Sequence, residues 1–255
     1  MSRGLGDVYK RQIIHSKKLK NEDLSYVIAP TVGGDKMDEN LEKETNEFLR
    51  EHNCEYKVVK GYGMTEVNAA VAACTSNETN KIGSVGIPFP NTTISIFDPK
   101  TGEELGYNEK GEVCITGPNT MLGYFNNDEE TNKILRKHED GNVWVHSGDI
   151  GYMDADGNLY IVDRLKRMII RPDGFKIFPS LIEDVVVKHP SVQSCKAVGL
   201  RDFSFSQGKL PKVHVVLNET DRNPEAIENE ILMLCEEQLP EYYWPCEIEL
   251  SLIHI

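Results

Sequence analysis

A glycine-rich hexapeptide limits what this chain can fold into, because it joins a segment with a strand pattern to a segment with a helix pattern. It reads Gly61-Tyr62-Gly63-Met64-Thr65-Glu66. Residues 54–60, which precede it, end in β-branched residues and predict a strand. Residues 67–73, which follow it, are rich in alanine and predict a helix. The order strand, glycine turn, helix is typical of an α/β fold.

The hexapeptide also has the residue types of a metal–nucleotide site. Its glycines let the backbone approach a ligand closely, and a helix that begins there would offer N–H groups and a positive dipole end to a phosphate. Thr65 adds a hydroxyl, and Glu66 has the charge needed to bind a magnesium ion that accompanies the phosphate. A second interpretation stays open, in which Thr65 caps an ordinary helix and Glu66 complements its dipole.

The residues upstream predict the rest of a β-α-β unit. Residues 24–30 predict a buried strand, and Asp38 can cap a helix over 38–52. Between them lies a glycine pair with an aspartate, Gly33-Gly34-Asp35. Because ligands of open α/β sheets bind at the carboxyl ends of the strands, the glycine pair and the hexapeptide are expected at the same edge.

The chain changes character twice further on. Residues 81–163 carry short alternating runs and hairpin turns, which predict a small antiparallel sheet or open barrel with a helix near 127–138. Residues 165–249 predict a compact α+β unit. The predicted fold class is therefore α/β over 13–80, then a distorted antiparallel β-barrel, then a small α+β domain.

The α+β unit contains several local signals. A turn at 171–174 predicts a hairpin, and Ser180 with Glu183 forms a capping-box pattern that predicts a helix start. Strands are predicted at 192–200 and 212–217, and a last helix after Asn223.

The two ends of the chain do not continue these patterns. Residues 1–12 and 250–255 resemble translated adapter or assembly scars, and the alternative is that they are ordinary termini. We exclude both from the fold prediction.

Composition excludes several classes of function. The net charge of −13 argues against a nucleic-acid partner and against an anionic membrane surface. No apolar run approaches the roughly 20 residues that cross a bilayer. The six cysteines form no C-x-x-C pair, which favours a reducing, cytoplasmic location. The sequence does not predict an oligomeric state.

Three further residues are candidates for binding. Asp149 follows a predicted strand in the turn Ser147-Gly148-Asp149, where its carboxylate could accept hydrogen bonds from ribose hydroxyls; it could also be a plain turn aspartate. Arg164 lies at the predicted domain junction and could bind a ribose or phosphate, or be a surface cation. Gly174 follows Asp173 and is most simply a turn glycine.

Together and in this order, five blocks resemble the adenylate-forming (AMP-binding) superfamily, of the acyl-CoA synthetase or aryl-CoA ligase type. The resemblance spans about residues 13–249 and corresponds to the C-terminal half of the family. The blocks are Gly33-Gly34, Gly61–Glu66, Gly111–Gly117 with Gly123-Tyr124-Phe125, Ser147-Gly148-Asp149 with serine for threonine, and Asp163–Lys166 through Pro179 and Glu183. By this resemblance, 13–164 is part of the large AMP-binding domain, and 165–249 is the mobile C-terminal domain.

The resemblance also implies roles for single residues. Tyr62 would stack on adenine, Thr65 would hold the adenylate phosphate, and Glu66 would bind magnesium. Asp149 and Arg164 would hold the ribose. Lys166 would be the hinge residue, and Gly174 would border the pantetheine tunnel. A turn that borders adenine and the acyl pocket would be formed by Gly33, Gly34 and Asp35. The nucleotide-binding motif would be completed by Gly61, Gly63 and Met64.

The implied reaction is the ATP-dependent joining of a carboxylic acid, a small-molecule substrate that the sequence does not identify, to coenzyme A, with ATP/AMP, Mg²⁺ and CoA as cofactors. The family's Ser/Thr/Gly-rich phosphate loop and its catalytic lysine have no counterpart here, and the turn 171–173 has one extra residue. We therefore expect a fragment that keeps much of the adenylate site and does not activate an acid by itself. Three alternatives stay open: an amino-acid adenylation domain serving a carrier protein, a non-catalytic adenylate-binding module, and a truncated, poorly folding piece.

Overall fold

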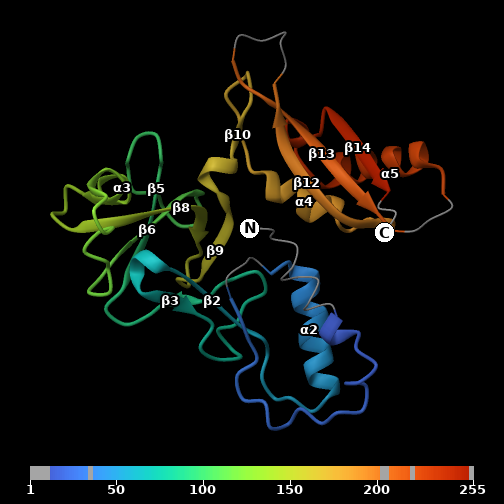
Figure 1. Ribbon diagram of the computed structural model, residues 1–255, viewed down its shortest axis with the longest axis horizontal. Coiled ribbons are helices and arrows are strands. Elements are labelled where there is room, and N and C mark those ends of the chain that lie inside the picture. Colours follow the sequence, from blue (N-terminus) through green and yellow to red (C-terminus); the bar gives the residue numbers. More distant parts are fainter. Residues whose placement is uncertain (1–11, 34–36, 202–206, 219–221, 253–255) are drawn as a thin grey trace. The chain divides into compact units, whose positions relative to one another are not determined.

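Figure 1 shows the computed structural model, which describes residues 12–33, 37–201, 207–218 and 222–252. The chain forms two compact units, Met1–Ile161 and Val162–Ile255. In the part of the chain that the structure describes, no helix has the length and apolar character needed to cross a membrane.

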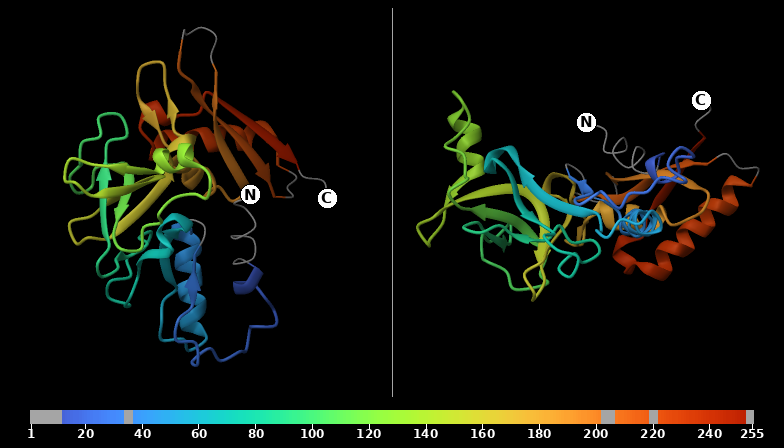
Figure 2. Two further views of the ribbon diagram at one scale, coloured as in Figure 1. Left: turned by 60° about the vertical axis from the view of Figure 1, so that its left-hand side comes forward. Right: turned by 90° about the horizontal axis from the view of Figure 1, so that it is seen from below.

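The first sheet of unit 1 has the order β1-β2-β3-β4. Its strands are β1 (Thr31–Val32), β2 (Val59–Met64), β3 (Ala69–Ala73) and β4 (Ile87–Pro88). β1 and β2 pair in parallel, whereas β3 pairs antiparallel with both neighbours. The helix α2 (Glu39–Glu51) connects β1 to β2, and Figure 2 shows it beside these strands.

The helix predicted over 38–52 is confirmed. The Asp38 side chain accepts hydrogen bonds from the N–H groups of Asn40 and Leu41 and so caps its first turn. Leu41 and Leu49 are buried on its inner face, in a cluster with Met37, Cys54 and Val58.

A buried ion pair also fastens α2 to β2. The Lys60 Nζ donates to the Glu42 carboxylate and to the carbonyl of Lys81, and the N–H of Gly83 donates to the second Glu42 oxygen. These partners satisfy both charges inside the protein, which fixes the strand directly before Gly61.

Two predicted elements of this region are wrong. Residues 24–30 form turns instead of a strand, and the paired strand β1 begins only at Thr31. The apolar side chains of Leu24 and Val27 pack against the α2 cluster, which explains the hydrophobic run without a sheet.

The alanine-rich run 67–73 is not a helix. Only Thr65–Val67 forms a 3₁₀ turn (η1), and Ala69–Ala73 is the strand β3. Asn68 and Ala69 have φ values of 57° and 89°, in a region that interrupts a right-handed helix. Pairing with β2 and burial of Val71 and Ala72 therefore override the helix propensity of alanine.

The second sheet of unit 1 has the order β5-β6-β8-β7, and β9 also pairs with β8. Its strands are β5 (Thr93–Phe97), β6 (Gly111–Thr116), β7 (Leu135–Lys137), β8 (Val143–Met153) and β9 (Leu159–Arg164), of which residues 159–161 belong to unit 1 and the rest to unit 2. The helix α3 (Asp128–Ile134) precedes β7. Among the described residues no sheet closes into a barrel, because β5 and β7 remain the two ends of the strand order; the barrel predicted over 81–163 is corrected to an open sheet.

One apolar core joins the two sheets of unit 1. It contains buried side chains from β3, β5, β6, β8 and β9, with Val67 of η1 beside them. Burial of each such valine, leucine or isoleucine stabilises the fold by about 1.5–3 kcal/mol. The core members are Val67, Val71, Ala72, Ile94, Ile96, Val113, Ile115, Val145 and Leu159.

Unit 2 contains a three-stranded sheet of order β12-β13-β14. Its strands are β12 (Val192–Leu200), β13 (Leu210–Leu217) and β14 (Glu247–Leu252), where β14 runs parallel to β13. The helices are α4 (Pro179–Val186) and α5 (Pro224–Gln238), with short turns η2 (Leu165–Arg167) and η3 (Glu241–Tyr243). The predicted hairpin is present as β10 (Ile169–Ile170) and β11 (Lys176–Ile177). Figures 1 and 2 show α5 lying along the sheet.

The two helix starts of unit 2 have different outcomes. Asn223 caps α5 through the N–H of Glu225, as predicted. The capping box at Ser180 is wrong, because α4 begins one residue earlier and has no side-chain cap. Ser180 instead donates its hydroxyl to the carbonyl of Val162 and its N–H to Asp163, while Glu183 binds Arg167.

Candidate functional site

The hexapeptide forms the end of β2 and the start of η1. An open pocket of about 580 Å³ is lined by Gly33, by the hexapeptide from Gly61 to Thr65, and by residues 68–70. Gly33 and the hexapeptide therefore share one edge, as predicted. Gly34 and Asp35 lie outside the described residues.

Gly63 is required by the backbone packing at this pocket. The register of β2 and β3 shifts between Tyr62 and Gly63, which marks a β-bulge. A Cβ on Gly63 would lie 1.8 Å from the carbonyl oxygen of Ala69. The absence of a side chain thus allows the two strands to approach each other beside the pocket.

The helix N-terminus expected at Thr65 is absent. A 3₁₀ turn of three residues has neither the aligned dipole nor the row of free N–H groups with which the N-terminus of an α-helix would bind a phosphate. Thr65 is exposed at the pocket edge, and no side chain caps η1. A phosphate contact at this position would depend on the Thr65 hydroxyl and on single backbone N–H groups.

Glu66 meets Tyr124 from the loop before α3. The Tyr124 hydroxyl donates to Glu66 Oε1, and this hydrogen bond, followed by burial, raises the pKa of Tyr124 to about 12. The Glu66 backbone carbonyl accepts from the N–H of Met121. A half-buried carboxylate with its Oε2 unengaged by any described residue fits the oxygen ligands that magnesium prefers.

Asp149 lies in a bulge of β8. His146 pairs with Cys114 and Ile150 pairs with Glu112, so Ser147, Gly148 and Asp149 together oppose the single residue Val113. The Ser147 hydroxyl donates to the carbonyl of Val113 at 2.6 Å and accepts from the N–H of Asp149 at 3.0 Å. These two hydrogen bonds of Ser147 stabilise the bulge at the point where backbone pairing between β6 and β8 is interrupted.

Asp149 and Tyr62 are brought together. The Tyr62 hydroxyl donates to Asp149 Oδ2 at 2.7 Å, and Asp149 is only 4% exposed. This bond connects the bulge of β8 to the bulge of β2, and so to the pocket that Tyr62 lines.

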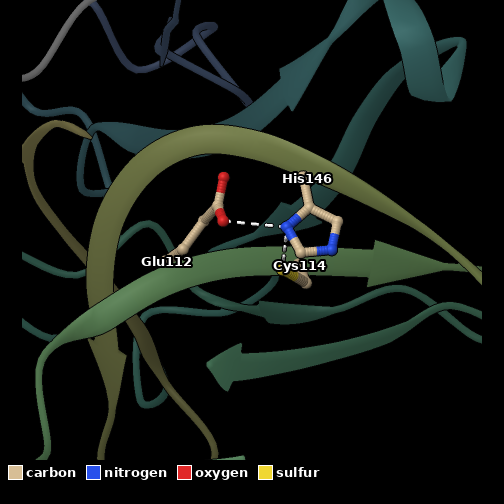
Figure 3. Close-up of side chains that lie close together, drawn as sticks. All are labelled: Glu112, Cys114 and His146. Atoms are coloured by element: carbon tan, nitrogen blue, oxygen red, sulfur yellow. Dashed lines mark hydrogen bonds and ion pairs between the residues drawn. The ribbon is translucent and has the colours of Figure 1, made fainter. Parts of the chain in front are cut away.

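A buried polar cluster beside this bulge was missed by the sequence analysis. Figure 3 shows the side chains of Glu112, Cys114 and His146 close together. Their ligand-type atoms all lie within 4.8 Å of one another. His146 Nδ1 lies 2.8 Å from Glu112 Oε2 and 3.5 Å from Cys114 Sγ. Burial raises the pKa of the Cys114 thiol. Glu112 and Cys114 alternate with apolar residues in β6, and nothing in that pattern indicates a histidine partner from β8.

The remaining predicted residues belong to unit 2. Arg164 ends β9 and is exposed, and its N–H donates to Asp163 Oδ1. Lys166 is exposed in η2. Gly174 closes the turn between β10 and β11 with its N–H on the carbonyl of Arg171 and a φ of 88°, a conformation that favours glycine.

Two family profiles match the chain. The profile of the AMP-binding enzyme family matches residues 9–125, and that of the AMP-binding enzyme C-terminal domain matches residues 181–251. A probable 4-coumarate–CoA ligase of Dictyostelium discoideum is 38% identical over 203 residues, which make up 79% of this chain and 35% of that protein. A long-chain-fatty-acid–CoA ligase of Escherichia coli O157:H7 is 37% identical over 192 residues, or 75% and 32% of the two chains.

A solved structure agrees with these relatives. The o-succinylbenzoate CoA synthetase of Bacillus subtilis, in complex with its acyl-adenylate intermediate, has a TM-score of 0.78 and 27% identity. The match covers 96% of this chain and 46% of that one. This chain spans about a third of the length of the curated relatives. From both profiles and from these relatives we conclude that the chain belongs to the AMP-binding enzyme family.

Proposed function

We propose that this chain binds the adenylate part of an acyl-adenylate, and that the protein it belongs to is an ATP-dependent carboxylic acid–CoA ligase. The observation that carries the proposal is the hydrogen bond between Tyr62 and Asp149. Two residues far apart in the sequence, each with a nucleotide role implied by the family, meet beside a pocket lined by the glycine-rich hexapeptide.

The geometry suits a nucleoside monophosphate. The Asp149 carboxylate can accept hydrogen bonds from both ribose hydroxyls, and it already holds one donor in Tyr62. Tyr62 lines the pocket, and its ring would offer a face for adenine. Thr65 is exposed at the same pocket and can donate its hydroxyl to the phosphate.

The proposed reaction has two steps. A carboxylate oxygen of the acid attacks the α-phosphate of ATP and pyrophosphate leaves; the thiol sulfur of coenzyme A then attacks the acyl carbon and AMP leaves. The chain's residues contribute by positioning and charge stabilisation. Glu66 would hold Mg²⁺, which would supply charge neutralisation at the phosphates.

The residues of unit 2 have proposed roles in the same reaction. Arg164 would hold the ribose, Lys166 would act as the hinge residue between the two half-reactions, and Gly174 would border the pantetheine arm of coenzyme A. Their exposure leaves Arg164, Lys166 and Gly174 accessible to such ligands.

Isothermal titration with AMP tests the adenylate proposal on the chain itself. We expect saturable binding of AMP. We expect Asp149→Ala to weaken this binding by ~10-fold or more, because the variant loses the charge-assisted hydrogen bonds to the ribose. Asp156→Ala, which removes an exposed aspartate of the β8–β9 turn, is the matched control and should bind AMP as the unaltered chain does. Equal affinity of the Asp149 and Asp156 variants would contradict the proposal.

A further inference from the structure

Glu112 contacts the bulge that carries Asp149 at two points. Its Oε1 accepts from the N–H of Gly148 at 3.1 Å, and its Oε2 lies 2.8 Å from His146 Nδ1. Gly148 is the middle residue of the bulge and has a φ of 67°, and His146 is the residue before the bulge. One side chain of β6 therefore holds both the apex and the start of the bulge. Figure 3 shows its contact with His146.

The hydrogen bonds of this cluster fix the direction of each donor. An ionised carboxylate only accepts, so His146 must carry its proton on Nδ1. His146 Nε2 then accepts, and His138 Nε2, at 2.9 Å, must be the donor. Burial lowers the pKa of His138, which favours a neutral donor there.

The same cluster has the donor types of a zinc site, namely a carboxylate, a thiol and an imidazole. Its atoms are already engaged with one another and with the backbone: Glu112 uses both oxygens, and His146 uses both ring nitrogens. This saturation favours a role in holding the backbone over a role in binding an ion.

We propose that Glu112 is a positioning residue for ribose recognition, which orients the Asp149 carboxylate through Gly148 and His146. The proposal rests on the proposed function, because it assumes that Asp149 binds the ribose hydroxyls. Glu112 would touch no ligand, but it would determine whether Asp149 recognises the two ribose hydroxyls.

The test compares two ligands, AMP and 2′,3′-dideoxy-AMP, which lacks both hydroxyls. We expect the unaltered chain to bind AMP ~10-fold or more tightly than the dideoxy compound. Glu112→Ala should lose most of this preference by weakening AMP alone, as Asp149→Ala should, and the double variant should lose no more than either. Glu78→Ala, at an exposed glutamate outside this network, is the matched control and should keep the preference.

A second variant separates positioning from mere folding. In Glu112→Gln the amide oxygen can accept from Gly148 while the amide N–H donates to His146, provided that His146 moves its proton to Nε2. We therefore expect ¹⁵N NMR to show His146 protonated on Nδ1 in the unaltered chain and on Nε2 in Glu112→Gln, with the ligand preference largely retained.

The outcomes distinguish the two proposals. If the unaltered chain shows no preference for AMP, the proposed function fails. If it shows the preference, and Asp149→Ala loses it while Glu112→Ala keeps it, only the positioning role is overturned. A Glu112→Ala variant that weakens both ligands equally, a His146 protonated on Nε2 in the unaltered chain, or stoichiometric zinc in the purified protein would also overturn the positioning role.

Discussion

The two bulges of unit 1 that carry the candidate site are built in opposite ways. The bulge of β2–β3 depends on missing side chains: Gly63 is exposed and accommodates the Ala69 carbonyl where a Cβ cannot fit. The bulge of β6–β8 depends on buried polar side chains, since Ser147 and Glu112 replace the interrupted backbone ladder. A site can thus obtain an open ligand-facing edge from glycine and a fixed carboxylate from a hydrogen-bond network.

This difference predicts how each bulge responds to substitution. The glycine bulge should tolerate no added atoms at its point of closest approach and should depend little on side-chain hydrogen bonds. The polar bulge should tolerate replacements that keep a donor or an acceptor in place.

Gly63→Ala should have the largest effect. The new Cβ would meet backbone atoms of Ala69 and Ala70, and the strands would have to separate, at a cost of about 3 kcal/mol in the free energy of unfolding. Urea denaturation measures this cost. Gly33→Ala is the control, because a Cβ there meets no atom within 4 Å; similar stability of the two variants would refute the close-approach argument.

Ser147→Ala should have the next largest effect. It removes the hydroxyl that bonds both the Val113 carbonyl and the Asp149 N–H, at a cost of about 2 kcal/mol. Ser147→Thr keeps the hydroxyl and should lose much less. Urea unfolding of the two variants measures the loss in free energy of unfolding. Equal losses in Ser147→Ala and Ser147→Thr would mean that the hydroxyl does not stabilise the bulge.

Tyr62→Phe should have a smaller effect, because it breaks only the bond between the two bulges. Loss of the hydroxyl from Asp149 Oδ2 should cost about 1 kcal/mol. In a double-mutant cycle with Asp149→Ala, which removes the acceptor, the two changes should be non-additive by a similar amount. Additive losses would show that the two bulges are independent.

Tyr124→Phe should have the smallest effect, about 0.5 kcal/mol or less, since the Tyr124–Glu66 bond is only half buried. The bond raises the pKa of Tyr124 from 10.0 to about 12. Its small stabilisation should therefore be complete below pH 10 and decline as the pH rises towards 12. Unfolding of both proteins at pH 8 and pH 11 checks this; a difference that grows with pH would contradict it.

Local signals in the sequence predicted much of the fold, but not the elements that depend on distant pairing. The helix after Asp38 and the helix after Asn223 were predicted because their caps are local. The strand β3 was mistaken for a helix, because alanine favours helices unless a glycine-lined strand pairs with it. The barrel was predicted from hairpin signals, which do not reveal whether the end strands β5 and β7 meet.

The candidate site was predicted unevenly for the same reason. Asp149 and Tyr62 belong to short segments with their own glycine signals, and the structure brings them into contact. Glu112 and His146 look like ordinary alternating positions of two strands, and only the register between β6 and β8 places them together. Arg164, Lys166 and Gly174 belong to unit 2, and their roles stay predictions.

A crystal structure of the chain with AMP would show whether Asp149 binds the ribose. We expect both ribose hydroxyls within hydrogen-bond distance of the Asp149 carboxylate, with adenine against the Tyr62 ring and the phosphate near Thr65. AMP bound with its ribose away from Asp149, or crystals that remain free of AMP at saturating concentration, would contradict the account.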